Sequence, residues 1–83
     1  METYPKIKSV QPLQNKQLRV TFVTGANKIY DCTALLDQAH FAPLKNDIFF
    51  QQVHAERTGY GVVWNDEVDL SESELWINGQ PVH

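Results

Sequence analysis

Three carboxylates lie close together in the second half of the sequence, at Asp66, Glu67 and Asp69. Closely spaced carboxylate oxygens can bind a divalent cation or share a proton in acid–base catalysis. Their spacing is poor for both roles, because Asp66 and Glu67 fall in a tight turn and Asp69 alternates with apolar neighbours. We expect these side chains to be solvated, and an electrostatic contact with a partner is their better functional interpretation.

A histidine gives the second candidate chemistry. His54 and Glu56 are two residues apart, so they share one face of a strand, where the carboxylate could orient the imidazole as a base. The sequence shows no serine or cysteine that is evidently paired with His54. A small enzyme that uses His54, Glu56 and the acidic turn is the alternative interpretation, and it requires these side chains to converge in one concave pocket.

Metal, cofactor and redox chemistry find little support in the sequence. His40, His54 and His83 are far apart and have no metal-type spacing to one another or to the single cysteine, Cys32. Cys32 ends a predicted strand as a small buried apolar residue and cannot form an internal disulfide, which fits a reducing cytoplasm. The glycines of the run 59–61 lead into a strand and lack a following lysine, so they make no phosphate loop. We expect no cofactor and no bound metal.

The length of the chain limits the class of protein. Its 83 residues make one domain, residues 1–83, which buries only about 60–65% of the surface that its unfolded chain exposes. Small folds of this kind often gain stability from a partner or from a second copy. The sequence shows neither a signal peptide nor an apolar stretch that could cross a bilayer, so we expect a cytoplasmic protein without a membrane contact.

The distribution of charge argues against nucleic acid as a partner. The formal net charge is −3, and most of the seven Lys and Arg residues lie in the first third of the chain. Binding to phosphates needs several cations on one surface. Weak binding of nucleic acid is a third interpretation, and it requires four cations to share a face: Lys6, Lys8, Arg19 and Lys28.

Apolar periodicity predicts a series of short strands. Leu18, Val20 and Phe22 follow the period of two that is typical of a half-buried strand. The run 24–27 then supplies glycine and asparagine for a reversing turn, so residues 28–32 should fold back as an antiparallel partner and the first strands should form a meander. The predicted strands cover residues 6–12, 18–23, 28–32, 53–56, 60–64 and 68–70.

Start and stop signals predict short helices around these strands. Ser71 precedes Glu74 by three residues, which is a capping box: the hydroxyl accepts from the Glu74 amide and the carboxylate reaches back. Asn46 is a good N-cap, and Gly79 suits the position after the last helix. The predicted helical segments cover residues 34–38, 47–52 and 72–78, with a loop over 39–44.

These elements predict a single small α+β domain, with a mostly antiparallel sheet of five or six strands and short helices packed on one face. Tyr60, Val62 and Trp64 alternate onto one face of a strand, and burial of that face builds the most continuous core. We therefore expect Trp64 to be largely buried. The sequence leaves open whether Trp76 and Ile77 belong to the core or to an interface.

Several segments are similar to one known family. They are Tyr4-Pro5, Tyr30-Asp31 ahead of Leu35-Leu36, Phe-Ala-Pro-Leu at 41–44, Gly-Tyr-Gly-Val-Val-Trp-Asn-Asp-Glu-Val-Asp-Leu at 59–70, and Glu74-Leu75. Through them, nearly the whole chain resembles the small prokaryotic family called domain of unknown function 2442. The resemblance implies a compact α+β domain without an established activity, cofactor or substrate. It also implies a genetic context, because members are often encoded beside another very short protein, as in a toxin–antitoxin pair.

The leading hypothesis is a non-catalytic protein-interaction module of the bacterial cytoplasm, acting as the accessory or antitoxin-like member of a two-gene pair. The expected interaction surface consists of Asp66, Glu67, Asp69 and Trp76. The expected partner is a small protein or a second copy of the chain, with no nucleic acid and no membrane.

Overall fold

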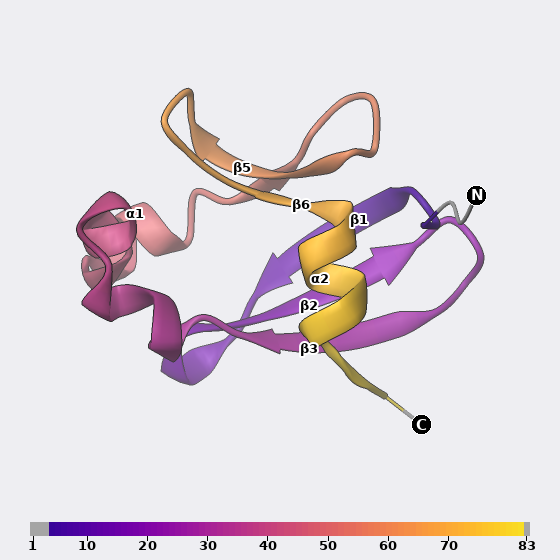
Figure 1. The fold of residues 1–83 in the computed structure, drawn as a ribbon, viewed down its shortest axis with the longest axis horizontal. Helices are drawn as coiled ribbons and strands as arrows, with labels where there is room; N and C mark the ends of the chain where they lie inside the picture. Colours follow the sequence, from indigo (N-terminus) through magenta and orange to yellow (C-terminus); the bar gives the residue numbers. More distant parts are fainter. Residues whose placement is uncertain (1–3, 83) are drawn as a thin grey trace.

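Seven strands form two antiparallel sheets in residues 4–82, the part of the chain that the computed structural model describes. The first sheet has the order β1-β2-β3-β7 and the second the order β4-β5-β6. Figure 1 shows the second sheet above the first, with helix α2 (Glu72–Asn78) in front. The strands are β1 (Ile7–Pro12), β2 (Gln17–Phe22), β3 (Asn27–Asp31), β4 (His54–Ala55), β5 (Gly61–Asn65), β6 (Val68–Ser71) and β7 (Gln80–Pro81).

The α+β class is confirmed, but the single sheet of five or six strands is wrong. Twenty-two residues separate β3 from β4, and they carry the chain across one end of the first sheet. Strands β4 to β6 therefore pair among themselves, and the free side of β3 pairs instead with the C-terminal strand, through Lys28 with Pro81 and Ile29 with Gln80. Periodicity reports which face of a strand is buried, but it does not report which strand lies alongside.

The first three strands form the expected antiparallel meander. Val20 of β2 lies opposite Val10 of β1 and Lys28 of β3. Leu18, Val20 and Phe22 are completely buried, as their spacing predicts. Gly25, with a φ of +92°, supplies the left-handed residue in the turn between β2 and β3.

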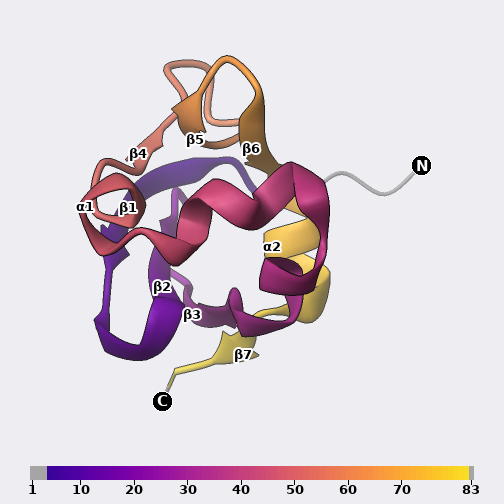
Figure 2. The ribbon, with the colours of Figure 1, turned by 90° about the vertical axis from the view of Figure 1, so that its left-hand side faces the viewer.

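Three short helices connect the two sheets. They are the 3₁₀ helices η2 (Thr33–Asp37) and η3 (Ala39–Lys45) and the α-helix α1 (Asp47–Phe50). Figure 2 shows this segment lying across the ends of both sheets. The loop expected over 39–44 is therefore wrong, because these residues continue the 3₁₀ path up to the Asn46 cap.

The predicted N-caps are confirmed in both α-helices. The Asn46 side chain accepts from the Phe49 amide at 3.0 Å, and the Ser71 hydroxyl accepts from the Glu74 amide at 3.2 Å. The second half of the capping box does not form, because the Glu74 carboxylate accepts from Tyr30 at 2.8 Å and from Asn78 at 2.9 Å. This carboxylate thus ties α2 to the first sheet.

One apolar core joins the two sheets and the helices. Trp64 is 4% exposed, as predicted, and its indole Nε1 donates to the Phe50 carbonyl at 2.9 Å. Tyr60 is 55% exposed, so its expected place on the buried face is wrong: β5 begins only at Gly61. The buried apolar residues are Ile7, Leu18, Val20, Phe22, Tyr30, Cys32, Leu44, Phe50, Val53, Val62, Trp64, Val68, Leu70 and Leu75.

Candidate functional site

The three carboxylates of the acidic turn, Asp66, Glu67 and Asp69, are exposed on the β5–β6 hairpin. The Asn65 side chain fixes the turn, because its Oδ1 accepts from the Glu67 amide at 2.8 Å and from the Val68 amide at 2.9 Å. Val68 and Leu70 point into the core, so Asp69 faces outward by strand alternation. The acidic turn is thus a fixed, solvent-facing group of carboxylates.

The residues of the alternative interpretation, a small enzyme that uses His54, Glu56 and the acidic turn, do not form one pocket. The Glu56 carboxylate accepts from the Thr58 hydroxyl, and the His54 Nδ1 lies 3.3 Å from the Gln52 carbonyl. Sheet pairing places His54, Val63 and Asp69 in one row across β4, β5 and β6. Two strand spacings put the outer residues of this row about 10 Å apart at their backbones, with the Val63 side chain between them.

Metal and nucleophile chemistry are not supported by the described residues either. Among residues 4–82, no three His, Cys, Asp or Glu side chains are grouped so that they could hold a metal ion. Cys32 is completely buried, and burial together with the Asp31 charge raises the pKa of its thiol to about 12. A thiol with so high a pKa carries almost no thiolate at neutral pH and is a poor nucleophile. His83 lies outside the described residues.

Trp76 and Ile77, whose positions the sequence left open, lie on α2 and face different surroundings. The Trp76 ring packs edge-on against Phe22, with 5.0 Å between ring centroids, and remains half-buried. The Lys28 ammonium lies 4.0 Å from the centroid of the Trp76 ring and donates to the Trp76 carbonyl. Ile77 is 62% exposed. Trp76 therefore spans core and surface, while Ile77 belongs to the surface.

A second aromatic residue lies under a cation nearby. The Lys6 ammonium is 5.0 Å from the centroid of the exposed Tyr60 ring. The Lys6 carbonyl accepts from the Val23 amide at 2.8 Å, and the Val23 side chain is also exposed. The Tyr60 carbonyl accepts from the Glu72 amide at 2.9 Å, which links this cluster to the start of α2.

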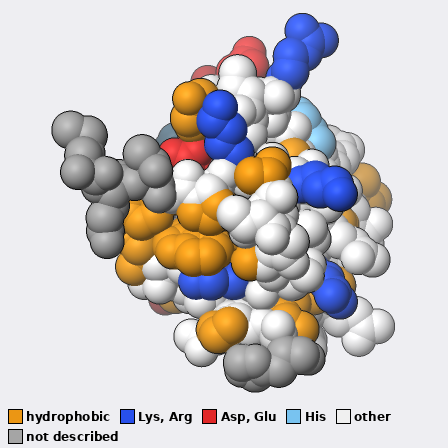
Figure 3. All heavy atoms as spheres, turned by 90° about the vertical axis from the view of Figure 1, so that its right-hand side faces the viewer, with side chains coloured by type: hydrophobic (Ala, Val, Ile, Leu, Met, Phe, Trp, Pro, Cys, Tyr) orange, Lys and Arg blue, Asp and Glu red, His pale blue; other side chains and the backbone are white. Residues whose placement is uncertain are grey.

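These residues define what we call the apolar–cationic end of the molecule. Figure 3 views the side of the domain that carries the β2–β3 turn and the loop before β5, at the right of Figure 1. Hydrophobic side chains gather in the left half of this view, with Lys or Arg side chains above and below them. The β5–β6 turn, which carries the acidic residues, lies toward the opposite side of Figure 1. The apolar–cationic end consists of Lys6, Val23, Lys28, Tyr60, Trp76 and Ile77.

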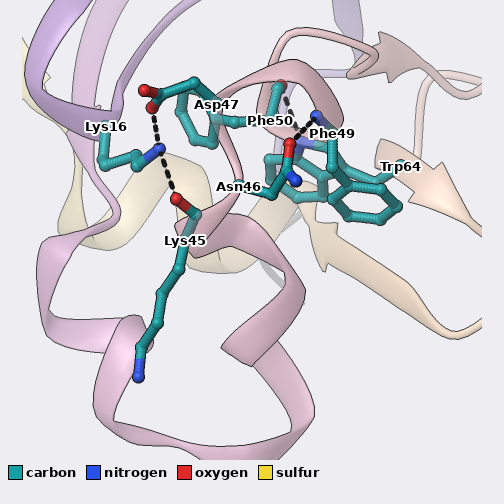
Figure 4. Close-up of polar contacts among 7 residues, drawn as sticks. All are labelled: Lys16, Lys45, Asn46, Asp47, Phe49, Phe50 and Trp64. Carbon is teal, nitrogen blue, oxygen red and sulfur yellow. Dashed lines mark hydrogen bonds and ion pairs between the residues drawn. The ribbon is translucent and has the colours of Figure 1, made fainter.

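A polar junction at the other end fixes α1 against the first sheet. Figure 4 shows the Lys16 ammonium between the Asp47 carboxylate and the Lys45 carbonyl. Lys16 and its neighbour Asn15 have left-handed backbones, with φ values of +60° and +62°. A lysine is unusual there, because this conformation costs a non-glycine residue about 1–2 kcal/mol. The sequence indicated a turn at these residues but gave no sign of the ion pair.

Sequence reasoning selected Trp76 for the surface but missed Tyr60, Val23 and the two lysines that lie over aromatic rings. The signal for Tyr60 was available, since Gly59 and Gly61 on either side of it favour a turn over a strand. The contacts of Lys6 and Lys28 are tertiary, and the sequence contains no pattern that predicts them.

Comparison with protein-family models identifies the family of this chain. Residues 7–80 match the family model described as protein of unknown function (DUF2442). The chain belongs to this family. No curated protein matches the DUF2442 domain described above.

Among solved structures, this DUF2442 domain is similar to a protein from Nitrosomonas europaea whose crystal structure carries the name "Putative DNA Binding Protein". The two chains are 28% identical, with a TM-score of 0.78. The match covers 94% of this chain and 52% of the other, so this chain spans about half the length of that protein. Within residues 4–82, helices are too short and too polar to cross a membrane.

Proposed function

We propose that this DUF2442 domain is a non-catalytic protein-interaction module that binds a small partner protein. The observation that carries the proposal is the exposure of large apolar side chains beside a core that is already closed. Val23, Tyr60 and Ile77 are 60%, 55% and 62% exposed, and none of them is needed to complete the core. Grouped apolar side chains on a small protein are typical of an interaction site.

The arrangement of the polar residues supports the same proposal. Within residues 4–82 the His54 ring contacts the Gln52 carbonyl and no serine or cysteine hydroxyl or thiol, and the acidic turn is exposed at the tip of a hairpin. Catalytic groups work when they converge around one point in a cavity. An exposed, well-ordered acidic turn suits an electrostatic contact instead, and we retain Asp66, Glu67 and Asp69 as a second contact surface.

The genetic context that the family resemblance implies indicates which kind of partner to expect. An accessory or antitoxin-like member of a two-gene pair has to recognise its companion by surface complementarity, and it needs no chemistry of its own. We therefore propose a small co-encoded protein as the partner, in the bacterial cytoplasm.

Affinity capture from the native host tests this proposal. The tagged full chain should bring down one protein in stoichiometric amount, and nuclease treatment should leave the yield unchanged. Recovery of the chain alone, or recovery of nucleic acid without a stoichiometric protein, would contradict the proposal.

Nucleic-acid binding is the second candidate function, and the name of the similar Nitrosomonas europaea protein favours it. About half of that protein lies outside the match, so its named activity need not belong to the shared half. The pairing of β2 with β3 places Val20 opposite Lys28 and Arg19 opposite Ile29, so Arg19 and Lys28 point to opposite faces of the sheet and do not form one cationic surface. Fluorescence anisotropy with a labelled DNA duplex at about 0.15 M salt distinguishes the candidates, because saturable binding there would favour DNA.

A further inference from the structure

We propose that the apolar–cationic end docks an acidic segment of a partner protein, a segment that also carries apolar side chains. This inference rests on the proposed function and gives it a surface and a partner chemistry. The apolar–cationic end differs from the acidic turn in both position and charge.

The apolar–cationic end is one continuous surface because backbone contacts join its parts. The Val23 amide donates to the Lys6 carbonyl at 2.8 Å, and the neighbouring Ile7 amide donates to the Gly59 carbonyl at 2.8 Å. These bonds place the end of β2, the start of β1 and Tyr60 side by side. The Glu72 amide donates to the Tyr60 carbonyl at 2.9 Å, which brings α2, with Trp76 one helical turn further along, to the same surface.

The Trp76 ring is packed in place before any partner arrives, and the Tyr60 ring is restricted by a single contact with Lys6. Trp76 is held by Phe22 on one side and by the Lys28 ammonium on another. Rings that are already ordered lose little conformational entropy on binding, and Trp and Tyr are enriched among the residues that dominate binding energy.

The charge of this surface selects the partner. Lys6 and Lys28 lie over the two rings, so the ammonium groups border the apolar side chains. Glu72, which is half-buried and bonded to the Tyr60 carbonyl through its amide, lies beside these lysines, whereas the exposed Asp66, Glu67 and Asp69 lie on the hairpin toward the opposite side of the molecule (Figure 1). An acidic segment with apolar anchors would complement both features, because charge complementarity raises association rates and rejects like-charged partners.

Two other occupants fit less well. A second copy that docked face to face would bring Lys6 and Lys28 toward the same cations of its partner. Docking of the acidic turn of a second copy would be head-to-tail, which propagates into an open chain unless the rotation closes a ring. Duplex DNA needs several cations on one surface, whereas this end carries two lysines, Lys6 and Lys28, beside a broad apolar area (Figure 3).

Site-specific photo-crosslinking in the native host tests the docking surface. Benzoylphenylalanine replaces Ile77 or Tyr60 in the full chain, and in the control it replaces Ile48, which is 74% exposed on α1 at the other end. A fourth variant carries benzoylphenylalanine in place of Glu67, in the acidic turn. All four side chains are exposed, and circular dichroism verifies that each chain is folded. Mass spectrometry then identifies the crosslinked peptide.

We expect Ile77 and Tyr60 positions to give at least fivefold more crosslinked product than the Ile48 position, joined to a peptide with a net negative charge and apolar side chains. A basic peptide, a second copy of the chain, nucleic acid, or equal yield at Ile48 would overturn the inference. Crosslinks from the Glu67 position alone would overturn the docking surface and leave the interaction module standing. Absence of protein crosslinks from every position would overturn both.

Discussion

At the scale of single residues, Trp64 joins the second sheet to α1. Its ring lies 6.0 Å from the Phe50 ring, centroid to centroid, and its indole nitrogen donates to the Phe50 carbonyl (Figure 4). The second sheet and α1 are therefore joined through one side chain. The burial of Trp64 was predictable from the alternation of residues 60–64, but its bond to Phe50 was not, because no pattern relates the two positions.

Replacement of Trp64 by alanine should cost about 3–5 kcal/mol of folding free energy, because it removes apolar contacts and leaves a cavity. That is comparable with the lower end of the stability range of protein domains, about 5–15 kcal/mol, where a domain of this size is expected to lie. We expect a mostly unfolded protein by circular dichroism. A folded variant with native stability that no longer binds its partner would instead show that Trp64 is an interface anchor.

The Ser71 cap gives a more limited test. Ser71→Ala removes the acceptor of the Glu74 amide and should lower the free energy of unfolding by about 0.5–2 kcal/mol in chemical denaturation. Ser73→Ala is the matched control, because the Ser73 hydroxyl lies 3.1 Å from the Ser71 hydroxyl but does not cap α2. Equal denaturation midpoints for Ser71→Ala and the unmodified chain would contradict the cap.

The Cys32 thiol should limit the stability of the folded domain at alkaline pH. The thiol titrates near 9.0 in the unfolded chain and, because burial raises its pKa, at about 12 in the folded chain. Between these values the unfolded state binds fewer protons, so stability falls as pH rises, at about 1.4 kcal/mol per pH unit. Below pH 9 the contribution is fully present. Tyr30, whose pKa burial also raises, adds to the loss only above about pH 10.

Urea denaturation at pH 8, 9, 9.5 and 10 measures this effect. The unmodified chain should lose stability between pH 9 and pH 10, and Cys32→Ala should show a clearly smaller loss over the same interval. Parallel curves for the two chains would show that the thiol does not set the alkaline limit.

At the scale of elements, the sequence predicted most strands, their caps and the meander of the first three strands, but not the division into two sheets or the pairing of β3 with β7. Periodicity defined β2, the β5–β6 hairpin and α2 closely, since each has a strong local pattern and clear end signals. The division into two sheets depends on where the segment 32–53 leads the chain, and that path follows from tertiary packing of η2, η3 and α1. The reciprocal capping bond was missed for a similar reason, because Tyr30 competes for the Glu74 carboxylate.

Gly61 and Gly25 are required for different reasons: a side chain at Gly61 would clash with the neighbouring strand, and Gly25 has a left-handed backbone. A Cβ at Gly61 would lie 2.5 Å from the Leu70 carbonyl oxygen, inside the β5–β6 pairing, whereas a Cβ at Gly25 would meet open space. Gly61→Ala should therefore force the strands apart and cost at least about 1–3 kcal/mol. Gly25→Ala should cost only about 1–2 kcal/mol, through its left-handed backbone. Thermal denaturation that ranked Gly25→Ala as the more harmful change would contradict this account of the hairpin.

At the scale of the whole molecule, one end is apolar and cationic and the other carries the acidic turn. The core uses the large aromatic residues Phe22, Phe50 and Trp64, yet Tyr60 stays exposed and Trp76 only half-buried. The sequence indicated the acidic turn because its carboxylates are adjacent in the chain. It could not indicate the other end, whose six residues come from β3, from α2 and from the segments next to β1, β2 and β5, and meet only in the folded protein.

The most direct test of the central claim, that this domain acts by binding a protein through its apolar–cationic end, is quantitative capture from the native host with paired variants. Ile77→Ser and Ile48→Ser each remove one exposed isoleucine, from opposite ends of the molecule. Truncation of a hot-spot residue costs about 2 kcal/mol or more, so Ile77→Ser, as an anchor of this surface, should lower partner recovery at least about tenfold while Ile48→Ser leaves it unchanged. Equal recovery with both variants, or a selective loss with Ile48→Ser, would contradict the claim.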